Sequence, residues 1–144
     1  MRKRNATIGG LLLGAAIVLF LILQVLPVFP RTNPPVIAEP AWDSPATRAL
    51  AKRACFECHS NESYWPWYAY VAPVKWLLVY DVDHGRAAFN FSDWHPGDLY
   101  GEYVAEVISS GRMPLPRYLL LHPEARLSDA EKQQLISGLI ATMK

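Results

Sequence analysis

The residues most able to do chemistry in this sequence are Cys55, Cys58 and His59, in the segment CFECH. The C-x-x-C-H spacing is typical of c-type haem attachment, in which each thiol adds to one vinyl group of haem. The histidine can then bind the iron through one nitrogen while the other donates to a carbonyl that fixes the ring. We therefore predict covalent haem c held through Cys55 and Cys58, iron coordination by His59, and a carbonyl acceptor near Pro66 or Pro73.

Three other interpretations of the two cysteines remain open. A thioredoxin-type dithiol is expected at the start of a helix in a βαβ unit, whereas here a predicted helix precedes the first cysteine. A zinc site needs a fourth ligand, and His84, His95 and His122 are not paired at ligand spacing. A plain disulfide is expected in an oxidising compartment if no cofactor consumes the thiols. Haem attachment is preferred because the motif, the predicted export and the aromatic residues that follow agree.

A six-coordinate haem iron needs a second axial ligand opposite His59. Met113 lies in the segment GRMPLP, after a predicted helix end at Gly111, and prolines stiffen the loop around its thioether. A Met–His pair raises the reduction potential, which suits electron transfer. His122 is the alternative sixth ligand, and Met143 is too close to the C-terminus. The competing interpretation of Met113 is a methionine that fills a gap in the core.

Aromatic residues are concentrated after the attachment motif, since 12 of the chain's 17 lie between residues 64 and 103. Haem has a large apolar face, so aromatic walls suit it and exclude water. We predict that Trp65, Trp67, Tyr68 and Trp76 contact the haem because they follow the attachment site most closely. The alternative is that these side chains only fill a small core.

The N-terminal part of the chain is predicted to be a membrane anchor. Ile8 to Leu26 contains no charged residue, and a helix of that length reaches about 28 Å, close to the thickness of the bilayer's hydrocarbon core. The preceding MRKR places the N-terminus in the cytoplasm and the rest of the chain in the periplasm, anchored in the inner membrane. A cleaved signal peptide is the alternative. The predicted parts are the anchor (1–27), a proline-rich linker (28–43) and a haem-binding domain (44–144).

The pattern of the exported part predicts a small, mostly α fold behind a single transmembrane helix. Helices are expected over residues 45–55, 74–89, 97–111 and 127–144, with Gly85 weakening or ending the second of them. No alternating strand pattern is present. The charge from residue 39 onward is −3, from 10 Lys and Arg against 13 Asp and Glu, and nothing there resembles a nucleic-acid-binding surface.

Four segments together resemble the bacterial haem-binding domain family, a cytochrome c-like group found behind an N-terminal membrane anchor. These segments are CFECHSNESYWPWY, VAPVKWL, FNFSDW and MPLPRYLLLHPEARLSDAE. The resemblance extends from Trp42 to the C-terminus, and the SNE…WPWY and HPEARLS parts are more specific than the attachment motif. It implies covalent haem c, a cytochrome c-like helical fold and export.

Two functions are consistent with these features. The first is a membrane-tethered monohaem cytochrome that transfers single electrons to an unidentified redox partner protein and is not an enzyme. The second is a peroxidase-like or gas- or redox-sensing domain, in which the sixth ligand is displaceable. The absorption spectrum distinguishes them, because a methionine ligand gives ferric haem a weak red band.

Overall fold

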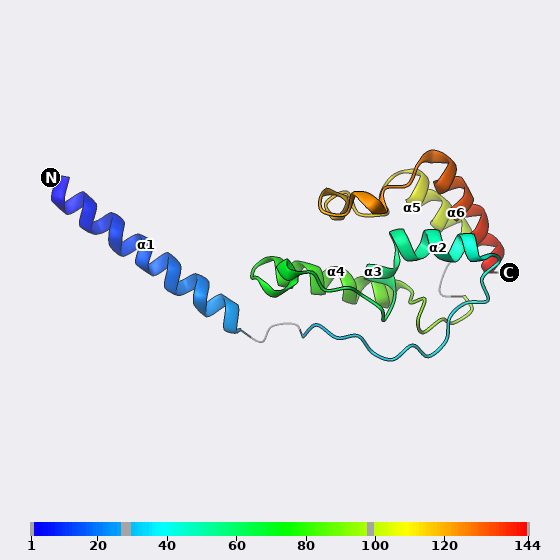
Figure 1. Cartoon of the computed structure of the whole chain (residues 1–144), viewed down its shortest axis with the longest axis horizontal. Helices are drawn as coiled ribbons and strands as arrows, with labels where there is room; N and C mark the ends of the chain where they lie inside the picture. The colour runs from blue at the N-terminus through cyan, green and yellow to red at the C-terminus, as the bar shows by residue number, and fades with distance from the viewer. Residues whose placement is uncertain (1, 27–29, 98–99, 144) are drawn as a thin grey trace. The chain divides into compact units, whose positions relative to one another are not determined.

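The protein is mostly helical, as predicted. The computed structural model describes residues 2–26, 30–97 and 100–143, with side chains from residue 8 onward, and these residues form no β-strand. The α-helices are α1 (Arg2–Val25), α2 (Pro45–Ala54), α3 (Phe56–His59), α4 (Val74–Ala88), α5 (Gly101–Ser109) and α6 (Asp129–Thr142) (Figure 1). Three 3₁₀ turns join them: η1 (Trp67–Tyr70), η2 (Tyr118–Leu120) and η3 (Pro123–Ala125).

The chain divides by its contacts into two compact units, which do not follow sequence order. The first contains residues 1–31 and 65–80, and the second contains residues 32–64 and 81–144. Helix α4 begins in the first unit and ends in the second. The anchor–linker boundary that the sequence predicts at residues 27 and 28 lies outside the described residues, as do positions 98, 99 and 144 of two predicted helices.

Helix α1 has the length and composition of a membrane-spanning helix. Its segment Ile8–Val25 has a mean hydropathy of 2.6, and none of that segment is buried by the rest of the protein. Leucine, isoleucine and valine side chains are exposed on every side of this helix. Such a surface is unfavourable in water and favourable in the hydrocarbon core of a bilayer.

The helices that begin and end the second unit start with capping residues. At the start of α2, the Ser44 side chain accepts a hydrogen bond from the backbone of Thr47, and Pro45 occupies the first turn. At the start of α6, Ser128 and Glu131 form a reciprocal capping box. Each cap satisfies backbone N–H groups that have no partner within the helix, so both starts are determined locally.

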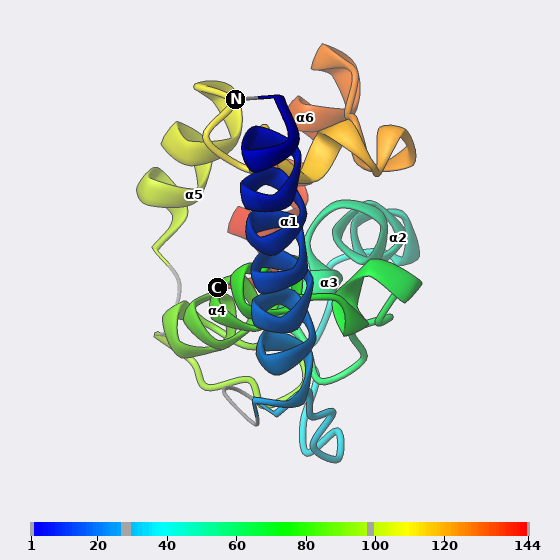
Figure 2. The same cartoon turned by 90° about the vertical axis from the view of Figure 1, so that its left-hand side faces the viewer.

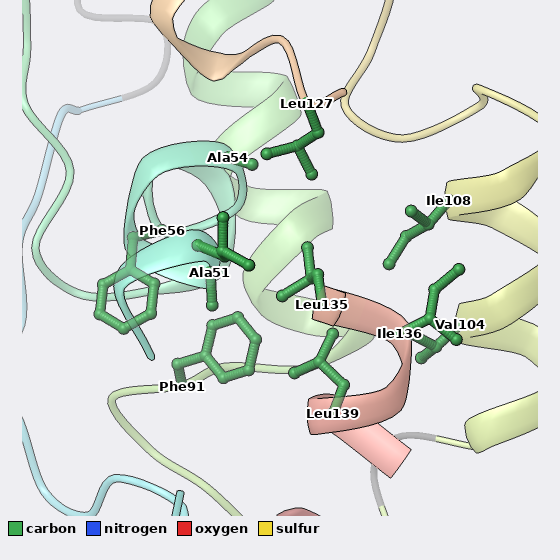
Figure 3. Packing of buried hydrophobic residues seen from close by; sticks show 11 residues of the cluster. Ala51, Ala54, Phe56, Phe91, Val104, Ile108, Leu127, Leu135, Ile136 and Leu139 are labelled. Atoms are coloured by element: carbon green, nitrogen blue, oxygen red, sulfur yellow. The ribbon is translucent and has the colours of Figure 1, made fainter. Parts of the chain in front are cut away.

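Helix α6 is the centre of the second unit. It packs against both α2 and α5, and the view in Figure 2 separates α2 from α5, with the end of α6 between them. Figure 3 shows Leu135 and Leu139 of α6 among side chains from α2, α5 and the segment after α4. Leu135 is fully buried, and a Cβ at Gly138 would collide with the side chain of Thr47, so α6 and α2 are in close contact.

The predicted linker is not a free spacer along its whole length. The carbonyl of Pro35 accepts a hydrogen bond from the side chain of Asn61 (2.8 Å), and the N–H of Ile37 donates to the carbonyl of Ser92 (2.7 Å). Prolines lack an N–H donor, but their carbonyls still accept, so an extended proline-rich segment can pair with a neighbouring loop.

Candidate functional site

An apolar cavity of about 260 Å³ lies within the second unit. It is lined mainly by aromatic and aliphatic side chains, and it also contains a histidine, a cysteine and a methionine. The described lining residues are Ala54, Cys55, His59, Ala88, Phe89, Phe91, Tyr100, Tyr103, Val104, Val107, Ile108, Met113, Pro114 and Leu139. Two of the three motif residues and the favoured sixth ligand therefore meet in one cavity.

His59 is the last residue of α3 and is 8% exposed. Its Nδ1 lies 3.3 Å from the carbonyl oxygen of Phe89, and its ring stacks on the Phe89 ring at 4.0 Å between centroids. Burial lowers the pKa of His59, so the neutral imidazole is favoured. Because the carbonyl only accepts, Nδ1 is protonated, and Nε2 is the nitrogen that can bind a metal.

The acceptor for His59 differs from the one predicted. The sequence indicated a loop carbonyl near Pro66 or Pro73, whereas Phe89 is brought to the ring by the end of α4. The contact between His59 and Phe89 is a tertiary one, between the motif and the end of α4. A second hydrogen bond joins the same two segments, because the N–H of Phe91 donates to the carbonyl of His59 (2.8 Å). No sequence pattern near the motif specifies it.

The two cysteines are not bonded to each other in this structure. Burial raises the pKa of Cys55 to about 12, and burial followed by the nearby carboxylates of Asp81 and Glu57 raises that of Cys58 to about 12. Dithiol oxidoreductases need a thiolate of low pKa. The environment of this pair therefore does not fit a thioredoxin-type active site.

Residues 55–59, the predicted attachment segment, approach α4 closely at Gly85. A Cβ at this position would collide with the carbonyl of Cys58. The sequence predicted that Gly85 weakens or ends the helix, but α4 continues to Ala88. Gly85 allows the backbone of α4 to approach the backbone at Cys58. Its role is therefore in packing and not in ending the helix.

The loop after the motif is held by a network of hydrogen bonds. Arg86 donates from Nε to the carbonyl of Ser60 (2.8 Å) and from a guanidinium nitrogen to the hydroxyl of Ser63 (3.0 Å). The Ser63 hydroxyl donates to the carbonyl of Glu57 (2.7 Å), and the N–H of Asn61 donates to the hydroxyl of Ser92 (3.0 Å). The SNES segment thus fixes the chain on the C-terminal side of His59.

Met113 lines the cavity, and His122 is not among its described lining residues. The N–H of Met113 donates to the carbonyl of Val107 (2.9 Å), which holds the residue against the end of α5. His122 instead places its Nδ1 3.0 Å from a carboxylate oxygen of Glu124 and stacks its ring on Tyr118. Of the two candidate sixth ligands, Met113 is the one that shares the cavity with His59.

The aromatic residues around the cavity are not those selected from the sequence. Trp65, Trp67, Tyr68 and Trp76 belong to the first unit, and none is among the described lining residues. The aromatic lining residues are Phe89, Phe91, Tyr100 and Tyr103. The FNF segment, which contains Phe89 and Phe91, lies at the end of the helix predicted over residues 74–89 and was a usable signal for two of them. The prediction instead selected residues that are nearer to the motif in sequence.

The set of donors fits a haem better than a bare metal ion. Among the described residues, no three histidine, cysteine, aspartate or glutamate side chains cluster to hold a metal, so a zinc site is not supported. A histidine nitrogen, a thioether and an aromatic, apolar lining are what a haem requires.

Comparison with known proteins agrees with this chemistry. A family described as "Haem-binding domain" matches residues 18–141. The chain is also 27% identical over 98 residues to a protein of Escherichia coli strain K12 described as cytochrome c peroxidase Ccp, an alignment that covers 62% of this chain. The chain spans about a fifth (21%) of that relative's length. No solved structure matches the chain significantly.

Proposed function

The chain belongs to the haem-binding domain family, and from that premise we propose that it is a membrane-tethered cytochrome with one covalent haem c that transfers single electrons. The observation that supports this most strongly is the meeting of Cys55, His59 and Met113 in one apolar cavity. Bound haem would supply a one-electron iron couple. The protein residues would attach it, coordinate it and exclude water.

We assign covalent attachment to Cys55 and Cys58. Each thiol would add across one vinyl group: the C=C π bond and the S–H bond would break, sulfur would bond to one vinyl carbon and the hydrogen to the other, and no oxidant would be needed. Attachment would remove both thiols from redox chemistry, which suits an exported protein whose only two cysteines would otherwise form a disulfide.

We assign His59 and Met113 as the residues that would coordinate the haem iron. The Phe89 carbonyl would keep Nε2 of His59 available, and the loop after α5 would hold the Met113 thioether. A methionine ligand raises the potential and fills the position that peroxide or a gas would need. This coordination favours electron transfer over catalysis.

A peroxidase-like activity is the second candidate, because the E. coli relative is described as a cytochrome c peroxidase. It requires a sixth position that is open or displaceable. A high-spin spectrum of the purified protein, or rapid carbon monoxide binding after reduction, would favour it.

We further propose that α1 anchors the chain in the inner membrane, with the haem-binding residues in the periplasm. Its apolar length supports the anchor, and the three basic residues of MRKR support the orientation. A tether of this kind raises the local concentration of membrane-bound redox partners.

The experiment is a ferric absorption spectrum of the purified protein and of two methionine variants. Met113→Ala should abolish the weak red band that a sulfur ligand produces. Met143→Ala is the matched control, because Met143 packs against the core and does not line the cavity, and it should retain the band. A red band that survives in Met113→Ala would refute Met113 as a ligand.

A further inference from the structure

The aromatic segment Trp65–Tyr80 does not line the cavity, and its contacts give it another role. We propose that this interfacial segment, as we name it, lies in the headgroup region of the bilayer that α1 crosses. It would therefore be a lipid-binding surface, separate from the haem site. The proposal depends on the membrane anchoring proposed above.

The interfacial segment is bonded to the last turn of α1. The N–H of Ala72 donates to the side-chain oxygen of Gln24, and the ammonium of Lys75 donates to the Gln24 backbone carbonyl, both at 2.8 Å. Carbonyls in the last turn of a helix have no partner within the helix, and a cation there is favoured by the helix dipole. Lys75 is only 8% exposed, and its ammonium also lies 5.8 Å from the centroid of the Trp76 ring.

A second contact links the segment to the chain just beyond α1. Arg31 donates from its guanidinium to the carbonyl of Ala69 (2.9 Å), and the same group lies over the ring of Tyr70, 4.1 Å from its centroid. The segment is therefore held both at the end of the helix and a few residues after it.

These contacts determine the depth of the segment relative to a membrane. If α1 spans the hydrocarbon core, Gln24 lies where the helix leaves it, because α1 ends at Val25. Any group hydrogen-bonded to Gln24 is then at the level of the interface.

The composition and exposure of the segment fit that level. Residues 65–80 contain three tryptophans and three tyrosines, one lysine, and no aspartate or glutamate. Several apolar and aromatic side chains are exposed: Trp67 (78%), Tyr70 (57%), Tyr80 (51%), Leu77 (46%) and Val74 (39%). Tryptophan and tyrosine accumulate at membrane interfaces because each combines an apolar ring with a polar group. The absence of acidic residues avoids repulsion from lipid phosphates.

The test measures the depth of nitroxide spin labels in the full-length, haem-loaded protein, reconstituted in vesicles of phosphatidylethanolamine and phosphatidylglycerol. Labels are placed by Trp67→Cys and by Leu77→Cys, the second of which keeps every aromatic residue. Ile17→Cys reports the anchor. Leu120→Cys, at a site 75% exposed in the second unit, is the matched control for a label in water. Frequent collision of a label with oxygen indicates that the label lies in lipid. Frequent collision with a water-soluble nickel complex indicates that it lies in water.

We expect labels at 67 and 77 to lose accessibility to nickel relative to position 120 and to gain accessibility to oxygen. If labels at positions 67 and 77 are accessible to nickel while the label at 17 lies in lipid, the proposal for the interfacial segment is overturned. The membrane anchor is then still supported. A label at position 17 that is accessible to nickel would overturn both the membrane anchor and the interfacial position of the segment. Protection at 67 and 77 from both reagents would indicate a protein cover, such as a second copy, and would overturn lipid contact.

Discussion

Nδ1 of His59 lies 3.3 Å from the carbonyl oxygen of Phe89, and the two rings stack with an interplanar angle of 10°. One residue therefore sets both the tautomer and the orientation of the imidazole, through its backbone and its side chain. Such support is what keeps a metal-binding histidine in place before and after the metal is bound.

His59→Ala should separate attachment from coordination. The thioethers would still hold the haem, but the iron would lose one axial ligand, so the ferric spectrum should become high-spin. His95→Ala is the control, because His95 is exposed and does not line the cavity, and its spectrum should match that of the parent protein. An unchanged low-spin spectrum in His59→Ala would contradict the assignment.

Gly85→Ala should destabilise the protein although alanine is the better helix former. The new Cβ would meet the carbonyl of Cys58, and overpacking of this kind costs about 1–3 kcal/mol. Helix propensity returns up to about 1 kcal/mol. We expect a lower midpoint of urea unfolding, whereas Asp83→Ala, at an exposed position of the same helix, should shift it little. A stabilised Gly85→Ala protein would show that α4 and the attachment segment are farther apart.

Leu135→Ala tests the core that positions α2 and α5 around the cavity. Leu135 is 0% exposed, and removal of a buried leucine costs about 2–5 kcal/mol. The exposed Leu120→Ala should change the unfolding free energy by less than about 0.5 kcal/mol. Similar unfolding curves for the two variants would refute the central position of α6.

The capping box of α6 predicts a loss of stability in acid. Hydrogen bonds from the Ser128 backbone and from Arg53 lower the pKa of Glu131 from 4.5 to about 2. A carboxylate with a lowered folded-state pKa stabilises the fold above pH 4.5, and this contribution is lost as the pH falls toward 2. Glu131→Gln should therefore be less stable than the parent at neutral pH, with the difference vanishing near pH 2.

The control for this prediction is Glu102→Gln, which removes an exposed carboxylate from the first turn of α5. Chemical unfolding as a function of pH measures the free energy of unfolding of both variants. A difference between Glu131→Gln and the parent that stays constant down to pH 2 would contradict a role for the ionised side chain.

The sequence predicted the features that depend on local patterns. The predicted start of the helix at residue 45 is the observed start of α2, and the predicted start at residue 127 lies two residues before the observed start of α6; both helices begin at capping residues whose partners are within four positions. Haem binding was likewise indicated by a local motif, and the family match supports it; covalent attachment through that motif stays a prediction. The mostly α fold class was correct for the same reason.

The features that were missed depend on contacts between distant residues. The Phe89 acceptor, the approach of Gly85 to Cys58 and the pairing of Pro35 with Asn61 each join segments that lie far apart in sequence. Hydrophobic periodicity shows that a residue is buried but not which residue covers it. The tryptophans and the tyrosine predicted from the sequence to contact the haem belong to the same compact unit as α1, and their contact with haem stays a prediction.

The central claim is that one haem is covalently bonded to this polypeptide, and the mass of the denatured chain tests it most directly. The protein should be produced in cells that mature c-type cytochromes, denatured in acid and measured intact. We predict a single species heavier than the polypeptide by one haem, and a species without haem when Cys55 and Cys58 are both replaced by serine. A parent chain with the mass of the bare polypeptide, its thiols free or joined as a disulfide, would contradict the account.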